Sequence, residues 1–175
     1  DPDLQVDDIV LGKRSVNASN FKTPFRDKGE GSAPFEWLPM DLLASEGSAG
    51  EGDSAKDAER IRYYVADAEL LAAAHAVKGQ YKRGKVVEGT IASGNFWNNE
   101  LDRIVWLHTQ FGTSTEEMET ASAAQIAHSY GIPFLGIRVL SNNLTNGGHY
   151  DPSTATDCQA FVKQVVEQYI KHSKK

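Results

Sequence analysis

Apolar segments of strand length alternate with helix-favouring segments along this chain, and this alternation limits the folds that it can adopt. Three segments rich in apolar and β-branched residues predict strands, at residues 8–17, 85–93 and 133–140. Helix-like segments separate these strands and follow the last of them. Strands that alternate with helices favour an α/β fold, in which helices flank a mixed, largely parallel sheet.

Two helices are predicted from composition. Residues 54–77 are rich in Ala, Leu, Glu and Arg, which predicts one helix or two shorter pieces. Ser54 and Asp57 at the start of this segment resemble a capping arrangement. Residues 120–131 predict another helix, which a glycine ends.

Two further helices are predicted from apolar stripes. Residues 97–112 predict a helix that ends at Gly112, with one face formed by Leu101, Ile104, Val105 and His108. Residues 153–172 predict the last helix, with a stripe of Phe161, Val162, Val165, Val166, Tyr169 and Ile170. Cys158 lies in this last helix and is expected to be a small core residue.

A length of 175 residues predicts a single domain over residues 1–175. We expect a loop-rich insertion at about residues 20–55, because Pro, Gly and Ser punctuate this part of the chain. Its aromatic residues suit an interface or a lid. The chain begins without Met and runs almost directly into a strand pattern, so we expect an N-terminal segment of the same domain to be missing from it.

Charge and composition exclude several classes of protein. A formal net charge of -6 argues against a nucleic-acid partner or an anionic membrane surface, since both call for basic patches. No apolar run is long enough to span a bilayer, and no spacing of His, Cys and Asp suggests a metal site. We therefore expect no metal and no cofactor. The expected compartment is the cytoplasm, or a secreted or vacuolar location if an upstream signal peptide has been removed.

Polar and aromatic residues follow three predicted strands. Residues 94–99 follow the strand at 85–93, a short segment at 114–118 ends in Glu119, and residues 141–143 follow the last strand. Parallel strands place such residues at one edge of the sheet. Aromatics that stack, amides that read a ring edge and a carboxylate that accepts from paired hydroxyls together fit a ribonucleoside.

The segment EEMETASAAQIAHSYGIPFLGIRVLSNN (116–143) resembles the signature of the nucleoside phosphorylase superfamily, in particular of the 5'-methylthioadenosine/S-adenosylhomocysteine nucleosidases. ASGNFWNN (92–99) is similar to a strand end of that family, and DLQVDDIVL (3–11) resembles an earlier strand. The resemblance implies a nucleoside phosphorylase-like fold. It also implies cleavage of the N-glycosidic bond of purine nucleosides similar to methylthioadenosine or adenosylhomocysteine.

The resemblance assigns residues around the sugar. Glu119 matches the glutamate that holds the ribose hydroxyls, a role that suits a carboxylate because it can accept two hydrogen bonds and stabilise a cationic sugar. Met118 matches the methionine beneath the sugar. Arg138 and Ser141 match residues that support the catalytic acid. The alternative for Glu119 is a surface carboxylate at a helix N-terminus.

The resemblance also assigns residues around the base. Phe96 and Trp97 match the position of the aromatic that stacks on the base, and Asn98 lies at a base-edge position. For both aromatics, ordinary core packing remains an alternative.

Asn142 departs from the nucleosidase pattern, in which an aspartate acts as a general acid on purine N7. An amide can donate a hydrogen bond to N7 but cannot deliver a proton, and general acid catalysis contributes about 10²–10⁴-fold. Some purine nucleoside phosphorylases use Asn at the base, so the resemblance still makes Asn142 the catalytic partner of Glu119. Asn95 is a second amide in place of an acid, and Asn143 and His149 are alternative partners.

Two hypotheses follow. In the first, the protein is a nucleosidase or a phosphorylase, and a phosphorylase would use phosphate as its co-substrate. Residues outside this chain then bind the nucleophile. Family relatives are oligomers, so a homo-oligomer is expected. In the second hypothesis, the protein is a catalytically weakened relative that stores nitrogen or binds nucleosides. Glu119, Met118 and Arg138 favour the first hypothesis, whereas Asn142 and Asn95 favour the second.

Overall fold

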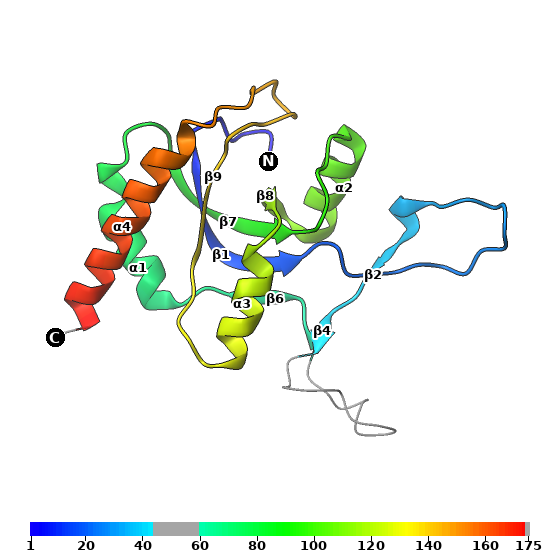
Figure 1. Cartoon of the computed structure of the whole chain (residues 1–175), viewed down its shortest axis with the longest axis horizontal. Coiled ribbons are helices and arrows are strands. Elements are labelled where there is room, and N and C mark those ends of the chain that lie inside the picture. Colours follow the sequence, from blue (N-terminus) through cyan, green and yellow to red (C-terminus); the bar gives the residue numbers. More distant parts are fainter. Residues whose placement is uncertain (44–59, 174–175) are drawn as a thin grey trace.

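The computed structural model describes residues 1–43 and 60–173, and a five-stranded sheet lies at the centre of this part of the chain (Figure 1). Its strands are β1 (Ile9–Asn17), β6 (Tyr63–Val65), β7 (Val86–Ser93), β8 (Thr113–Glu117) and β9 (Gly136–Val139). The order is β6-β1-β7-β8, and β9 also pairs with β1. β1, β7 and β8 run parallel, whereas β6 and β9 are antiparallel to β1. The predicted mixed, largely parallel sheet is confirmed.

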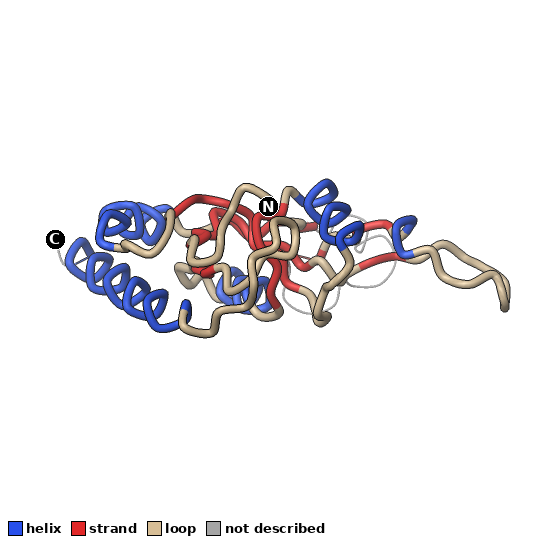
Figure 2. Tube along the Cα trace, turned by 90° about the horizontal axis from the view of Figure 1, so that it is seen from above, coloured by secondary structure: helices blue, strands red, loops and turns tan. Residues whose placement is uncertain are grey.

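Helices lie on both sides of the strands (Figure 2). They are α1 (Ala68–Val77), α2 (Leu101–Phe111), α3 (Thr120–Ser129) and α4 (Thr154–Ser173). α1 and α4 pack against each other, and together with Ile9 and Leu11 of β1 they enclose one buried cluster, which includes Cys158. The predicted packing role of Cys158 is therefore confirmed.

β1 is buried along most of its length because its neighbours cover both faces. Val10 points away from Ile9 and Leu11 and packs against Ile91 and Leu140. Farther along the strand, Val16 packs with a second group of core residues contributed by β7 and α2. This packing fixes the position of the carboxyl end of β7, which is followed by the polar and aromatic segment 94–99.

The prediction of helix over residues 54–77 is partly wrong. Within the described residues, β5 (Arg60–Ile61) and β6 (Tyr63–Val65) precede α1, and β5 pairs with β4 (Leu42–Leu43). Two tyrosines and a valine favour the pleated strand of β6. Asp67 then starts α1, because its carboxylate accepts from the Leu70 N–H at 2.8 Å. Ser54 and Asp57 lie outside the described residues.

The predicted apolar face of α2 is wrong. Leu101 and Val105 are exposed, and the helix buries Arg103, Leu107 and Phe111 instead. These three residues recur every four positions, so they form one face. Arg103 can occupy this buried face because its guanidinium stacks on the aromatic rings of Phe21 and Trp106.

The predicted last helix and the predicted end of α2 agree with the structure. α4 buries Phe161 and Val165 of the predicted stripe, whereas Val166 and Ile170 are exposed, so the buried stripe is narrower than predicted. Gly112 ends α2 with a left-handed φ of 65°, as its position in the sequence indicates.

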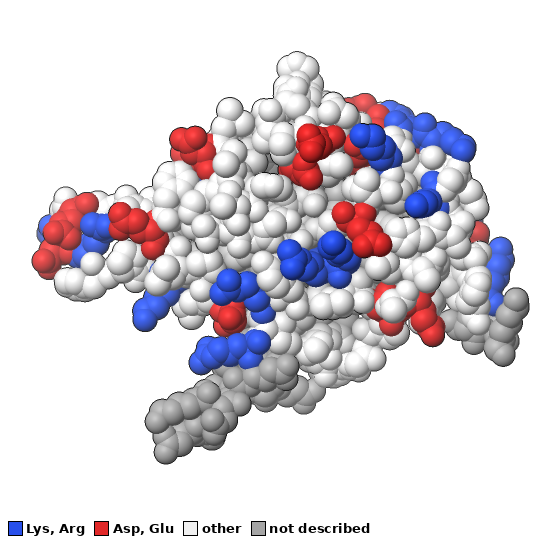
Figure 3. Space-filling model, turned by 180° about the vertical axis from the view of Figure 1, so that it is seen from behind, with Lys and Arg blue, Asp and Glu red and all other residues white. Residues whose placement is uncertain are grey.

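Residues 21–40 form an arm that projects from the body of the molecule (Figure 1). The arm closes at its base through β2 (Phe21–Lys22) and β3 (Leu38–Pro39), which pair antiparallel, and most of the residues between these two strands form loops and turns. The Phe21 ring lies 5.7 Å from that of Trp106 on α2, which anchors the base of the arm. Acidic and basic side chains intermingle over the face seen in Figure 3. No helix among the described residues has the length and apolar character needed to cross a membrane.

Candidate functional site

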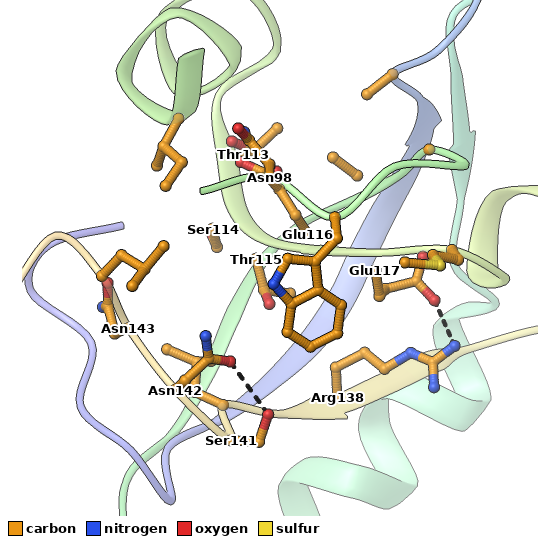
Figure 4. A pocket seen from close by; sticks show the side chains of 18 of the residues that line it. Asn98, Thr113, Ser114, Thr115, Glu116, Glu117, Arg138, Ser141, Asn142 and Asn143 are labelled. Carbon is orange, nitrogen blue, oxygen red and sulfur yellow. Dashed lines mark hydrogen bonds and ion pairs between the residues drawn. The ribbon is translucent and has the colours of Figure 1, made fainter. Parts of the chain in front are cut away.

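A cavity of about 420 Å³ lies between the carboxyl ends of β7 and β8 on one side and β9 with the segment after it on the other (Figure 4). Every residue that the sequence assigned to the site lines this cavity: Phe96, Trp97, Asn98, Met118, Glu119, Arg138, Ser141 and Asn142. The structure thus brings together residues from three separate segments of the chain.

The direction of β9 differs from the expectation that three carboxyl strand ends share one edge of the sheet. β9 is antiparallel to β1, so it runs opposite to β7 and β8. The cavity includes its residues because the Arg138 side chain extends toward the end of β8, where it forms an ion pair with Glu117 (Figure 4). The length of the Arg138 side chain, rather than the direction of β9, therefore brings this strand into the cavity wall.

Glu117 carries more hydrogen bonds than any other carboxylate in the described cavity. Its oxygens accept from the Ser93 hydroxyl, from the Glu119 N–H at 3.0 Å, and from the N–H and hydroxyl of Thr120 at 2.9 and 2.8 Å. Its side chain is 12% exposed, and Arg138 neutralises its charge. The sequence analysis assigned no role to Glu117, so this one was missed. Two features of the sequence indicated this role of Glu117. Successive side chains of a strand point to opposite faces, so Glu116 and Glu117 cannot share one environment, and the first N–H groups of a helix need an acceptor nearby.

The pKa of the Glu117 carboxyl reflects this surrounding. Burial alone raises the pKa, but the hydrogen bonds from Ser93 and from the N–H groups that start α3, together with the Arg138 charge, outweigh it. The result is a pKa below the ordinary value. Glu117 is therefore an anion that fixes the Arg138 side chain and the start of α3 around the cavity.

Glu119 has a different environment from its neighbour. Its side chain is 71% exposed at the mouth of the cavity and lies 3.1 Å from the Arg138 guanidinium. The structure also fits the alternative for Glu119, a surface carboxylate at a helix N-terminus, because Glu119 is the exposed N-cap residue of α3. Its side chain makes no capping hydrogen bond, however, and Glu117 accepts from the Thr120 N–H instead. Its oxygens thus face a space that a ligand can enter. Met118, partly exposed, lines the cavity beside it.

The two adjacent aromatics divide between core and cavity. Phe96 is half-buried and packs against the cluster that includes Leu107 and Phe111, so core packing describes much of its surface. Trp97 is 69% exposed and lines the cavity, with its ring nitrogen donating to Asn99 Oδ1 at 3.2 Å. Trp97 therefore offers the open aromatic surface of the pair.

Asn142 is oriented by its neighbour. Its Oδ1 accepts from the Ser141 hydroxyl at 3.3 Å (Figure 4), and its Nδ2 has no hydrogen-bond partner among the described residues. Nδ2 is therefore able to donate to a ligand. Asn95 is exposed and does not line the cavity.

Of the two alternative partners, Asn143 also lines the cavity, but its side-chain amide is already used within the protein. Asn143 is buried, and its Nδ2 donates to the Asp1 and Leu4 carbonyl oxygens at 2.9 and 2.7 Å. Its Oδ1 accepts from both the N–H and the hydroxyl of Thr145, so Asn143 organises the surrounding loop. His149 is exposed and does not line the cavity.

Glu116 is a second cavity residue to which the sequence interpretation gave no role. It accepts a hydrogen bond from Asn98 Nδ2 at 3.1 Å. Burial raises the pKa of its carboxyl, and the hydrogen bond from Asn98 opposes this effect only in part. Among residues 1–43 and 60–173, no group of three His, Cys, Asp or Glu side chains is placed to hold a metal ion.

The whole chain, residues 1–175, matches the family model of the phosphorylase superfamily. The chain therefore belongs to the phosphorylase superfamily, which confirms the resemblance found in its sequence. The 5'-methylthioadenosine/S-adenosylhomocysteine nucleosidase of Shewanella halifaxensis is 34% identical over 95 residues, covering 54% of this chain and 41% of that protein. The nucleosidase of the same name from Bacillus licheniformis is 31% identical over 111 residues, covering 63% and 44%.

Solved structures share the fold. Futalosine hydrolase of Helicobacter pylori has a TM-score of 0.62 and 23% identity, covering 96% of this chain and 62% of that one. The 5'-methylthioadenosine/S-adenosylhomocysteine nucleosidase of the same organism, solved in complex with a substituted pyrrolidin-3-ol, has a TM-score of 0.66 and 19% identity, covering 95% of this chain and 62% of that one. The chain thus spans less than half of these curated relatives and less than two thirds of these solved chains.

Proposed function

We propose that this chain forms part of an enzyme that cleaves the N-glycosidic bond of purine nucleosides, as a nucleosidase or a phosphorylase. The observation that carries the proposal is the composition of one cavity, which combines the exposed Glu119 carboxylate with Met118, the Trp97 ring and the free amide of Asn142. The similarity to methylthioadenosine/adenosylhomocysteine nucleosidases supports substrates of that kind.

In this proposal, each group acts on one part of the nucleoside. Glu119 accepts hydrogen bonds from the two ribose hydroxyls and stabilises positive charge on the sugar, while Met118 provides an apolar surface beneath it. The base stacks on Trp97, and Asn142 donates a hydrogen bond to N7. As the bond between C1' and N9 breaks, its electron pair moves to the base, and this hydrogen bond stabilises the negative charge.

Water or hydrogen phosphate completes the reaction when its oxygen bonds to C1' of the sugar. The proton that this nucleophile loses is balanced by the proton that the base takes up, so that the base leaves as a neutral molecule. We propose that residues outside this chain position that nucleophile, and that a second copy of the protein contributes to a homo-oligomer. The enzyme is proposed to need no metal and no cofactor, with phosphate entering as a co-substrate if the reaction is phosphorolysis. The partners are then small purine nucleosides, not nucleic acid or a membrane surface.

Asn142 also supports a second candidate function, that of a weakened relative that binds or stores nucleosides. An amide cannot transfer the proton that a carboxylic acid supplies, and this loss typically slows a reaction by about 10²–10⁴-fold. The ribose-binding part of the cavity is unaffected by this change, so binding survives in this candidate while turnover does not.

The test is to incubate the full-length protein with methylthioadenosine, adenosine and inosine, with and without phosphate, and to follow free base. Release of base is expected, and Glu119→Ala should abolish most of it, whereas the exposed Glu69→Gln variant should match the unmodified protein. Dependence on phosphate identifies a phosphorylase. No release from any nucleoside refutes the enzyme and favours the binding protein. Release that Glu119→Ala leaves unchanged refutes the site.

A further inference from the structure

The Glu116 carboxylate in the cavity wall is only half satisfied. Its Oε2 accepts from Asn98 Nδ2 at 3.1 Å, and its Oε1 has no hydrogen-bond partner among the described residues. Two positive groups lie near it, but neither forms an ion pair with Glu116. The Asp1 ammonium group donates to the Ser114 carbonyl at 3.2 Å, and Arg103 donates to the Pro34 carbonyl at 3.3 Å and stacks on Trp106. A half-buried carboxylate oxygen that has neither a direct ion pair nor a hydrogen-bond donor costs free energy unless a ligand donates to it.

The position of this carboxylate indicates which part of a ligand it meets. In Figure 4, Glu116 and Asn98 lie together at one side of the cavity, while Arg138 and Glu117 lie at the other, where the sugar is proposed to bind. Asn98 follows Trp97 in the chain, and both line the cavity together with Glu116, so the pair of Asn98 and Glu116 belongs to the part of the cavity where a ring is proposed to stack on the indole.

We propose that Glu116, held in place by Asn98, determines which bases this cavity accepts, by taking a hydrogen bond from an N–H on the six-membered ring of the purine. This assignment rests on the proposed function. Glu116 Oε1 accepts, and the second N–H of Asn98 Nδ2 donates, so the pair suits an edge that offers one N–H and one acceptor. Adenine offers the N6 amine and N1, and hypoxanthine offers N1–H and O6. Unsubstituted purine has the acceptor but no N–H at this edge.

The test compares adenosine, inosine and purine riboside on the full-length protein, with the dissociation constant measured by calorimetry and base release measured separately. The unmodified protein should bind adenosine or inosine roughly 10- to 100-fold more tightly than purine riboside, the range expected for a hydrogen bond to a charged group. Glu116→Val should reduce this preference to about threefold or less while leaving the affinity for purine riboside unchanged or higher. Glu69→Gln, on the exposed start of α1, is the matched control and should keep the full preference.

The pattern across the three ligands separates recognition from a structural role. A structural defect weakens all three nucleosides together, whereas loss of recognition affects the two that carry the N–H. Equal binding of the three nucleosides by the unmodified protein overturns the inference, as does a Glu116→Val protein that keeps the preference. Preference in binding without any base release refutes the proposed catalysis and supports the role of Glu116. Base release without preference does the reverse.

Discussion

Replacing Glu117 with Gln should destabilise the protein far more than the same change at Glu119. The Glu117 side chain is 12% exposed and accepts hydrogen bonds from Ser93, Thr120 and Arg138, whereas that of Glu119 is 71% exposed. Gln keeps the size of the side chain and one acceptor oxygen. It places an amide donor against groups that themselves donate, and it removes the charge opposite Arg138.

The magnitude follows from these contacts. A hydrogen bond to a charged group contributes about 1.5–3 kcal/mol, and removing one partner of a buried ion pair costs about 3–5 kcal/mol. Since the Arg138 side chain is 36% exposed and water can replace part of its interaction, we expect a loss of about 2–4 kcal/mol in the free energy of unfolding. In a protein of this size, that corresponds to a fall in Tm of roughly 4–16 °C. Glu119→Gln breaks an exposed ion pair and should cost about 0–1 kcal/mol.

The pH dependence of the same variant gives an independent check. Because the pKa of Glu117 is lowered from its ordinary value of 4.5 in the folded protein, its stabilisation is present above that value. It is lost as the pH falls through the lower, folded-state pKa. The stability difference between the unmodified protein and Glu117→Gln should therefore shrink on acidification below about pH 4.5. Urea unfolding at several pH values measures it. Equal losses for the two Gln variants, or a difference that does not change with pH, would refute the reasoning.

Three further changes give separate outcomes. Glu116→Gln should raise the Tm of the ligand-free protein at pH 7, because burial raises the pKa of this carboxyl and makes its ionised form unfavourable in the folded protein. The gain should disappear below about pH 4, where the carboxyl is protonated in both the folded and the unfolded protein, and a thermal scan at each pH checks this. Gly94→Ala places a Cβ 2.3 Å from a ring carbon of Phe96, so we expect a loss of about 1–3 kcal/mol in urea unfolding; unchanged stability would show that the ring can move freely. Asn142→Asp restores a general acid and should raise the rate of base release by about 10²–10⁴-fold at saturating nucleoside; an unchanged rate would show that proton transfer to the base does not limit turnover.

The strands and helices with strong local patterns were predictable, and the errors arose where tertiary contacts outweighed composition. The segment around Tyr63–Val65 lies next to residues with high helix propensity, yet pairing with β1 makes it a strand. The buried face of α2 includes Arg103, which an apolar pattern cannot reveal. Its burial depends on the Phe21 ring and the Pro34 carbonyl of the arm, in addition to Trp106 of α2 itself. The antiparallel direction of β9 likewise depends on a pairing between residues far apart in the chain.

The candidate site was predictable as a set of residues but not in its internal division of roles. A sequence motif places Met118 and Glu119 beside each other, and the structure finds both in the cavity with Trp97 and Asn142. The motif gives no information on which carboxylate is satisfied by the protein itself. That property depends on the position of Ser93 on β7 and on the free N–H groups at the start of α3.

Backbone geometry separates the three carboxylates of the segment 116–119 into different environments. Glu116 and Glu117 are adjacent in β8, where successive side chains point to opposite faces, so one meets Asn98 and the other meets Ser93 and Arg138. Glu119 follows the end of the strand at the start of α3, which turns its side chain outward to the mouth of the cavity. Glu117, whose hydrogen bonds are all supplied by the protein, thereby fixes the Arg138 side chain and the start of α3 next to the other two carboxylates. The two with remaining capacity to accept hydrogen bonds both line the cavity, where we propose that Glu116 meets the base of a nucleoside and Glu119 its sugar.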